Sequence, residues 1–554
     1  MPTLFERFAA RLAYWHARRV YGRFLASLED VRGVQRRTLA RVLAGLAESD
    51  YGRVHGLGAV RDARDLQHAA PLVTYEDMDP YMQRMCDGDY QALLNPGRTV
   101  HMFATSSGTT AKQKLIPVTS EFVRQYRRGW NIFGLKMLSD HPNAILRPIL
   151  QSSGRHDERH TPAGVPCGAI TGLLARSQKG IVRRFYVGRP EIAYIPDAHA
   201  KYYTLMRFGV LRDVAFAITA NPATLIRMAE TADAESENLL RDVRDGTLSA
   251  ALVPDASLRR RLEATLRPHP ERARALETLR RTHGVLRPRD YWQIEFVACW
   301  SGGSMGHYLE RLAEWWGPVP VRDIGLLASE GRVSIPFEDD TPAGVLDTQG
   351  AFFEFIPAER WHDPAAPTLT ADEIEPGQDY AIVLTNDTGL VRYRLGDVVR
   401  VRGRAGTTPI VEFLYRAGRV SSVAGEKLTE NQAVEAVRAA AAMLGVAPFE
   451  FILHPVWSSP PFYQMYTTAQ PGPDWAETID RMLGQQNDEY ASRRKSLRLG
   501  MLRVRHLPSS RLAALDHLLL GQRKSSAEQY KRPCLLTERD TEIVAILDPS
   551  GKRA

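Results

Sequence analysis

Cysteine is scarce in this chain, and long apolar runs are missing. Only four cysteines occur in 554 residues, and none has C-x-x-C or zinc-ligand spacing, so we expect no disulfide and no structural zinc. No run of about 18 apolar residues occurs, which argues against a membrane-spanning helix. The N-terminus also lacks the apolar core and small-residue cleavage site of a secretory signal. We therefore expect a cytoplasmic protein without a membrane partner.

Acidic residues fall slightly short of basic ones. The chain has 72 Lys and Arg against 64 Asp and Glu, a net charge of +8. Basic clusters occur at residues 259–261 and 493–495, but no aromatic residues interleave with them as in nucleic-acid modules. The surplus predicts an Arg-rich solvated surface, part of which attracts anionic substrates. We expect a monomer with small-molecule substrates and no nucleic-acid partner.

Internal repeats are absent, and the length suggests two or more domains. The first 300 residues alternate helical and extended patterns, which is typical of an α/β core. Aromatic residues spaced by four after Ser120 predict one helix, and residues 229–241 predict another. The apolar run 294–300 predicts a strand.

A β-rich pattern replaces this alternation from residue 351. A boundary near Arg416 separates it from a last segment in which Thr429 and Gln432 form a capping-box pair at a helix start. We predict a large N-terminal α/β domain with a β-barrel portion over 1–415, and a small mobile α+β domain over 416–554. Strands are expected in the small domain at 449–454, 462–468, 501–507 and 543–547.

One segment, Thr105 to Pro117, gathers hydroxyl groups in the sequence TSSGTTAKQKLIP. Apolar residues on both sides predict a tight loop between two strands, which we call the hydroxyl loop. Its hydroxyls, backbone N–H groups and the following lysines could hold a polyphosphate, although the Walker A spacing is absent. A polar surface turn explains the segment equally well if it is taken alone. The candidate phosphate-binding residues are Ser106, Ser107, Gly108, Thr109 and Thr110.

Three acidic or hydroxyl residues stand at predicted strand ends. Ser329 and Glu330 follow the apolar run 324–328, and a carboxylate there can hold Mg²⁺ against phosphate oxygens. Asp397 follows Gly396 where one strand is expected to end and the next to begin, and it can accept two hydrogen bonds from a ribose diol. Each pattern is also common in ordinary turns.

Two lysines of the small domain, Lys427 and Lys531, are candidate catalytic residues. A lysine delivered by a mobile domain could neutralise charge that develops on a carboxylate–phosphate transition state. Most such lysines are ordinary surface residues, so this assignment depends on the rest of the pattern.

A competing motif, G-x-S-x-G, covers Gly302 to Gly306. A strand before it and a helix after it match the nucleophile elbow of α/β-hydrolases, with Ser304 as the nucleophile. Under that hypothesis no HGGG-type oxyanion segment is present and the hydroxyl loop has no purpose. A serine hydrolase therefore remains the less favoured alternative.

Together these segments resemble the adenylate-forming superfamily of acyl-CoA synthetases, luciferases and peptide-synthetase adenylation domains. More narrowly, the chain is similar to the Gretchen Hagen family of acyl acid amido synthetases, which is known from plant auxin and jasmonate conjugation and is present in bacteria. The similar segments follow in order along nearly the whole chain. They include PLVTYEDMDPYMQRMCDGDYQALL, the hydroxyl loop, LLRDVRDGTLS, GAFFEFIP, GLVRYRLGDVVRV and EQYKRP.

The resemblance implies roles in ATP binding. The hydroxyl loop would hold the phosphates, and Gly303 and Ser304 would line the adenine–acyl cleft. Leu326 stands where the family has an aromatic that stacks on adenine, so apolar contact would replace stacking.

For the remaining candidates the resemblance implies contacts with phosphate, metal and ribose. Ser329 and Glu330 would contact phosphate and Mg²⁺, and Asp397 would contact the ribose. Arg416 would mark the interdomain hinge, beyond which the two candidate lysines approach the cleft.

The implied activity is that of a ligase that uses ATP and Mg²⁺. It adenylates a small carboxylic acid and then transfers the acyl group to an amino acid amine, with release of AMP. A ligase of the same superfamily that transfers the acyl group to CoA or to a carrier thiol is the main alternative.

Overall fold

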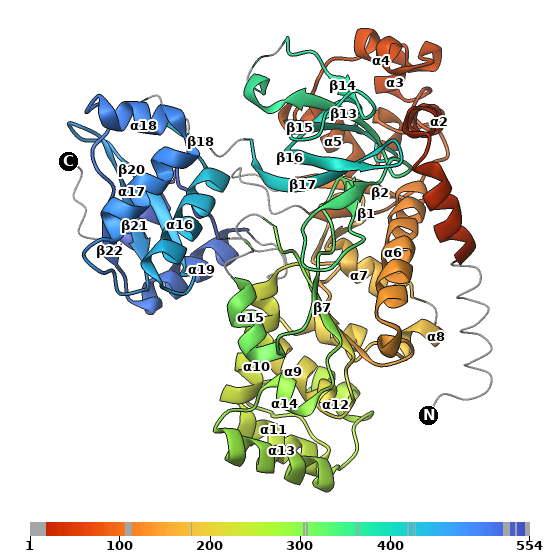
Figure 1. Cartoon of the computed structure of the whole chain (residues 1–554). Helices are drawn as coiled ribbons and strands as arrows, with labels where there is room; N and C mark the ends of the chain where they lie inside the picture. Colours follow the sequence, from red (N-terminus) through yellow and green to blue (C-terminus); the bar gives the residue numbers. More distant parts are fainter. Residues whose placement is uncertain are drawn as a thin grey trace.

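The computed structural model describes residues 18–105, 114–178, 180–302, 305, 308–361, 363, 365–417, 420–424, 426, 428–523, 532–537 and 540–548. Figure 1 shows a large N-terminal part with two lobes and a C-terminal domain, coloured blue, that lies beside them. The mixed α/β class and the large-plus-small arrangement predicted from the sequence are confirmed.

Helices near the start of the described chain pack on the upper lobe of Figure 1. Helix α5 begins at a capping box in which Thr74 and Asp77 bond each other's backbone N–H groups. The apolar faces of these helices share one core with the antiparallel sheet described below. Their bounds are α2 Val31–Leu43, α3 Asp50–Val54, α4 Ala63–Ala69 and α5 Tyr75–Cys86.

The hydroxyl loop follows strand β1 (Val100–Thr105) and precedes strand β2 (Leu115–Thr119), and the two strands pair antiparallel. The prediction of a connection between two strands is thus confirmed, while residues 106–113 themselves lie outside the described residues. Helix α6 (Ser120–Asp140) starts at once after β2, because the hydroxyl of Thr119 accepts the Phe122 N–H as an N-cap. Two further strands complete this sheet, β5 (Pro166–Gly168) and β4 (Arg159–His160).

The lower lobe holds a parallel sheet of order β3-β6-β7-β8 with helices around it. Its strands are short apolar segments, as expected for a sheet buried on both faces. The helix expected at 229–241 is two helices, because the backbone leaves the helical conformation at Glu235. The strands are β3 Ile149–Gln151, β6 Phe216–Ile218, β7 Phe296–Ala298 and β8 Val321–Arg322. The helices around it are α9 Ala198–Gly209, α10 Pro222–Ala234, α11 Ser236–Asp245, α12 Ala256–Glu263, α13 Pro270–His283, α14 Pro288–Tyr291 and α15 Leu309–Trp316. Helices α7 (Ile170–Arg176) and α8 (Gly180–Arg183) come before them in the chain, and Ile170 of α7 packs in the core of the upper lobe.

The β-rich segment forms a seven-stranded antiparallel sheet of order β11-β12-β17-β16-β15-β13-β14. The β-rich pattern predicted from residue 351 is confirmed by its members β13, β15 and β16. The small hairpin β9 (Leu327–Ala328) and β10 (Gly331–Arg332) lies before it in the chain. The sheet's strands are β11 Ser334–Ile335, β12 Gly344–Leu346, β13 Phe352–Pro357, β14 Leu369–Thr370, β15 Asp379–Thr385, β16 Tyr393–Ala405 and β17 Thr408–Arg416.

The C-terminal domain packs helices on a three-stranded sheet of order β20-β21-β22. Helix α16 starts at the predicted capping box of Thr429 and Gln432. The strand expected at 543–547 is wrong, since Thr541–Leu547 is helix α20. Its apolar residues Ile543 and Leu547 are four apart, so a helix buries both in one core. The elements are β18 Val420–Ser421, β19 Leu428–Thr429, α16 Glu430–Leu444, β20 Phe451–Val456, β21 Phe462–Thr467, α17 Trp475–Gln486, α18 Asp488–Lys495, β22 Arg503–His506 and α19 Ser509–Arg523.

Strand β17 ends at Arg416, and the apolar core around α16 and α17 draws all its members from residues after it. The predicted division at residue 416 remains a prediction, as does the mobility of the small domain. Among the described residues, no helix is both long and apolar enough to cross a membrane.

Candidate active site

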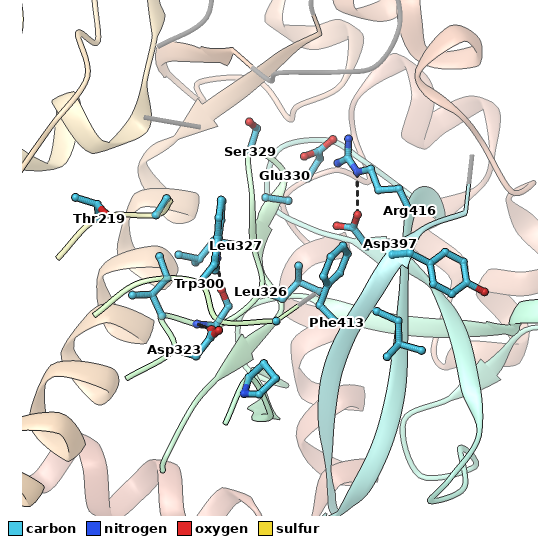
Figure 2. A pocket seen from close by; sticks show the side chains of 18 of the residues that line it. Thr219, Trp300, Asp323, Leu326, Leu327, Ser329, Glu330, Asp397, Phe413 and Arg416 are labelled. Carbon is cyan, nitrogen blue, oxygen red and sulfur yellow. Dashed lines mark hydrogen bonds and ion pairs between the residues drawn. The ribbon is translucent and has the colours of Figure 1, made fainter. Parts of the chain in front are cut away.

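A cavity of about 220 Å³ lies between the lobes of the large part and the C-terminal domain. Every described residue predicted for the site lines it: Leu326, Ser329, Glu330, Asp397 and Arg416. In Figure 2, Asp397, Arg416 and Phe413 stand on one side of the cavity, Thr219 and Trp300 on the other, with Ser329 and Glu330 between them. Residues far apart in the sequence therefore meet in one place, although their roles remain predictions.

The other predicted residues lie outside the described residues. They are Ser106, Ser107, Gly108, Thr109, Thr110, Gly303, Ser304, Lys427 and Lys531. Their neighbours in sequence reach the cavity in two cases, since Gly302 and Arg532 both line it.

Ser329 and Glu330 are the two residues of the tight turn between β9 and β10, because Ala328 pairs with Gly331. Their position after a strand, predicted from the apolar run, is confirmed. The Ser329 hydroxyl donates to the Thr105 carbonyl at 3.3 Å, so the turn touches the last residue before the hydroxyl loop. The turn therefore presents a carboxylate beside the predicted phosphate-binding segment.

Glu330 is held once through its backbone and once through its side chain, and the residue is only 3% exposed. The Asn386 side-chain amide donates to the backbone carbonyl of Glu330 at 2.6 Å. The Tyr393 hydroxyl lies 3.3 Å from Glu330 Oε1, and Lys114 donates to the same hydroxyl at 3.1 Å. Burial, together with the nearby Glu330 carboxylate, raises the pKa of the Tyr393 phenol, so the tyrosine stays protonated and can donate.

Asp397 faces Arg416 across the β16–β17 pairing, and the Arg416 Nε donates to its carboxylate at 2.9 Å. The expectation that one strand ends here and another begins is wrong, because β16 runs unbroken through this position. Gly396, with φ of +82°, instead bends the strand at an irregularity in its pairing with β15. The Asp397 carboxylate raises the pKa of the Arg416 guanidinium, so the guanidinium stays charged at neutral pH.

The apolar wall of the cavity was mostly missed by sequence reasoning. Tyr126 and Trp130 reach it from α6, where their spacing had signalled only a helix. Ile218 and Thr219 follow from the end of β6, and no local motif marks them. The predicted Leu326 does lie on this wall, beside Trp300, whose indole N–H donates to the Gly325 carbonyl at 2.9 Å.

The C-terminal domain closes one side of the cavity with the start of α16 and with Arg532 and Pro533. Arg532 is anchored within its own domain, since it donates to Asp516 at 2.6 and 2.9 Å and to Glu450 at 2.9 Å. The residue that follows the predicted catalytic Lys531 is thus fixed at the cavity edge.

Metal-binding capacity in the cavity is limited to oxygen donors. Among the described residues there is no group of three or more His, Cys, Asp or Glu side chains that could hold a metal alone. A second acid of the wall, Asp323, is engaged by Ser301 and by the Gly325 N–H. One buried carboxylate, Glu330, suits Mg²⁺, because this ion commonly binds through one or two carboxylates together with substrate phosphates.

Comparison with known proteins gives matches along most of the chain. The models of the GH3 family N-terminal, central and C-terminal domains match residues 20–321, 344–416 and 431–540. The probable indole-3-acetic acid-amido synthetase GH3.12 of Oryza sativa subsp. japonica is 29% identical over 95% of this chain and 94% of its own. Jasmonoyl–L-amino acid synthetase JAR6 of Nicotiana attenuata is 27% identical over 94% of this chain and 93% of its own.

Among solved structures, the AtGH3.15 acyl acid amido synthetase in complex with 2,4-DB shares the fold, with a TM-score of 0.84 at 22% identity. The match covers 96% of this chain and 95% of that one. The predicted resemblance is confirmed by these matches. The model of the N-terminal domain alone matches more than half of the chain, and the chain therefore belongs to the GH3 family.

Proposed function

We propose that this GH3 protein is an amido synthetase that couples an acyl acid to an amino acid with MgATP. The observation that carries the proposal is the convergence of the Ser329–Glu330 turn, Asp397 and an aromatic wall on one interdomain cavity. One relative is named as a probable indole-3-acetic acid-amido synthetase and another as a jasmonoyl–L-amino acid synthetase, and these names support the same class of reaction here.

The reaction needs two steps in this cavity. A carboxylate oxygen of the acid attacks the α-phosphorus of ATP, and pyrophosphate leaves. The amine nitrogen of the amino acid then attacks the acyl carbonyl, the bond to AMP breaks, and the amine gives up a proton. No residue becomes covalently bound, so the protein acts by positioning the reactants and balancing their charge.

The described residues of the candidate site have the following proposed roles in this reaction. Asp397, fixed by Arg416, would accept the ribose hydroxyls. Glu330 would hold Mg²⁺, which supplies charge neutralisation at the phosphates when it is bound. Leu326 would contact the adenine. The hydroxyl loop, Lys427 and Lys531 keep the roles that the sequence predicted.

The acid is best matched by a flat or apolar monocarboxylic acid. The apolar part of the cavity lining includes Tyr126, Trp130, Ile170, Ile218 and Thr219. None of these described side chains carries a charge, so a second carboxylate on the acid would be buried there without a partner. Indole-3-acetic and jasmonic acids, named for the relatives, are acids of this kind.

The test is ATP–pyrophosphate exchange with a library of carboxylic acids. We expect exchange that depends on an apolar acid and on Mg²⁺. Product analysis with amino acids or with CoA then identifies the acceptor, and an amide product with AMP is the expected result. Acyl-CoA formation would instead favour a thiol ligase. Ester hydrolysis without ATP would favour the serine hydrolase. We also propose, as the sequence predicted, that the protein acts as a monomer in the cytoplasm.

A further inference from the structure

Three side chains form a hydrogen-bonded chain from the hydroxyl loop to the Ser329–Glu330 turn. Lys114 is the first described residue after the loop, and its Nζ lies 3.1 Å from the Tyr393 hydroxyl. That hydroxyl lies 3.3 Å from Glu330 Oε1. The Lys114 ammonium also faces the rings of Tyr75 and Tyr393, at 5.4 and 5.8 Å from their centroids. Two segments about 200 residues apart in the sequence are thus joined through one phenol.

The chemistry of the donors sets the direction of this chain. An ammonium can only donate, so the phenol oxygen accepts a hydrogen bond from Lys114. The phenol O–H in turn donates a hydrogen bond to Glu330 Oε1. No hydrogen bond to Glu330 Oε2 is found among the described residues. Glu330 also lines the cavity, so a carboxylate that the protein holds through Oε1 is placed where a ligand can contact it.

The backbone around Tyr393 makes its hydroxyl a fixed point. Tyr393 is fully buried at the start of β16, where it pairs with Leu384 and bridges to Val73. Arg392 just before it has φ of +48° and is locked by a buried ion pair with Glu354. The pairing with Leu384, the bridge to Val73 and the ion pair of the preceding Arg392 fix the backbone of Tyr393. Its hydroxyl can therefore impose an orientation on the groups that it bonds.

We propose that Tyr393 is a positioning residue that orients the Glu330 carboxylate for Mg²⁺ and couples it to Lys114 beside the hydroxyl loop. This inference rests on the proposed function, in which Glu330 binds the metal. Partners that hydrogen-bond a metal-binding carboxylate fix its orientation, and their loss weakens metal affinity by roughly 10- to 100-fold.

The experiment compares ATP binding with and without Mg²⁺ by calorimetry in the full-length protein. The Tyr393→Phe variant keeps the ring and its packing but removes the hydroxyl. We expect the ratio of the two ATP dissociation constants, without and with Mg²⁺, to fall about tenfold or more. ATP affinity without Mg²⁺ should stay within about twofold, since Tyr393 is not among the described residues that line the cavity.

Tyr203→Phe is the matched control. Tyr203 is also fully buried and donates to a carboxylate, that of Asp242 at 2.6 Å, but in the core of the lower lobe. An unchanged ratio in Tyr393→Phe, or an equal fall in Tyr203→Phe, overturns the proposal.

Lys114→Met tests the chain from its other end and serves if Tyr393→Phe does not fold. Loss of the donor to the phenol should lower the same ratio, and an unchanged ratio contradicts the coupling. Failure of the proposed function has a different signature. In that case the wild type binds ATP with the expected Mg²⁺ dependence but shows no acid-dependent pyrophosphate exchange.

Discussion

The buried ion pair between Arg392 and Glu354 offers a sharp test of how the site is supported. Arg392 is 7% exposed and Glu354 1%, and the guanidinium contacts the carboxylate at 3.1 Å from both Nε and Nη2. Arg392 also donates to the Ala70 carbonyl at 2.8 Å. Arg392→Met removes the charge but keeps a long side chain. Methionine also has the same backbone preferences, so strain at φ of +48° does not change.

The expected loss is large because Glu354 would remain as a buried charge. Of the residues that the structure describes, only Gln67 and Thr368 would still bond its carboxylate, and neither is charged. Removing one partner of a buried pair typically costs about 3–5 kcal/mol. A large domain shifts by roughly 2 °C per kcal/mol, so we expect the melting temperature of the N-terminal part to fall by about 6–10 °C.

A double variant separates the charge from the other bonds of Arg392. Adding Glu354→Leu removes the orphaned carboxylate, and stability should return to within about 1–3 kcal/mol of the wild type. The remaining loss comes from the Ala70 carbonyl, which loses its donor, and from Gln67 and Thr368, which lose the carboxylate as an acceptor. Scanning calorimetry of both variants checks this. A fall below 2 °C in Arg392→Met, or a double variant as unstable as the single one, would refute the reasoning.

Further predictions concern the site and the C-terminal domain. Glu330→Gln should nearly abolish ATP–pyrophosphate exchange with the circular dichroism spectrum unchanged, and near-normal exchange at saturating Mg²⁺ would remove Glu330 from the metal site. Lys531→Ala should slow single-turnover pyrophosphate release about 100-fold with ATP affinity nearly unchanged; if affinity collapses and the rate does not, Lys531 is a static phosphate anchor. Burial lowers the pKa of His454 to about 4 from 6.5, so only the unfolded chain takes up its proton between these pH values. The C-terminal domain should therefore lose up to about 3 kcal/mol as the pH falls from 6.5 to 4, and His454→Leu should flatten this slope in pH-dependent unfolding; an equal slope in both proteins would contradict it.

Local signals in the sequence were enough to place many elements. The capping pair Thr429 and Gln432 marks the start of α16, and the aromatic spacing after Ser120 marks α6. Strand β15 follows from a nearly continuous apolar run, and β16 follows from apolar residues that alternate with arginines. These features depend on residues within a few positions of each other, so the chain reveals them without its fold.

Local signals failed where two structures fit the same apolar residues. Ile543 and Leu547 suit a strand by composition, but their burial in a core with α19 makes the segment helical. Gly396 predicts a corner, whereas pairing on both sides keeps β16 continuous and turns the glycine into a bend. Tertiary contacts outweigh local propensity in both cases.

The residues of the candidate site also fall into two groups, those that the sequence could indicate and those that it could not. Ser329, Glu330 and Asp397 could be chosen from the sequence, because a polar group beside a strand is visible locally and the family resemblance assigns it a role. The aromatic wall and the Lys114–Tyr393–Glu330 chain could not, since their members are brought together from segments far apart by β-pairing and helix packing. Sequence alone determined which chemical groups this protein carries and the family to which it is similar. Only the tertiary structure decided which of those groups meet, because hydrogen bonds and apolar burial act over a few ångströms in space, whatever the separation along the chain.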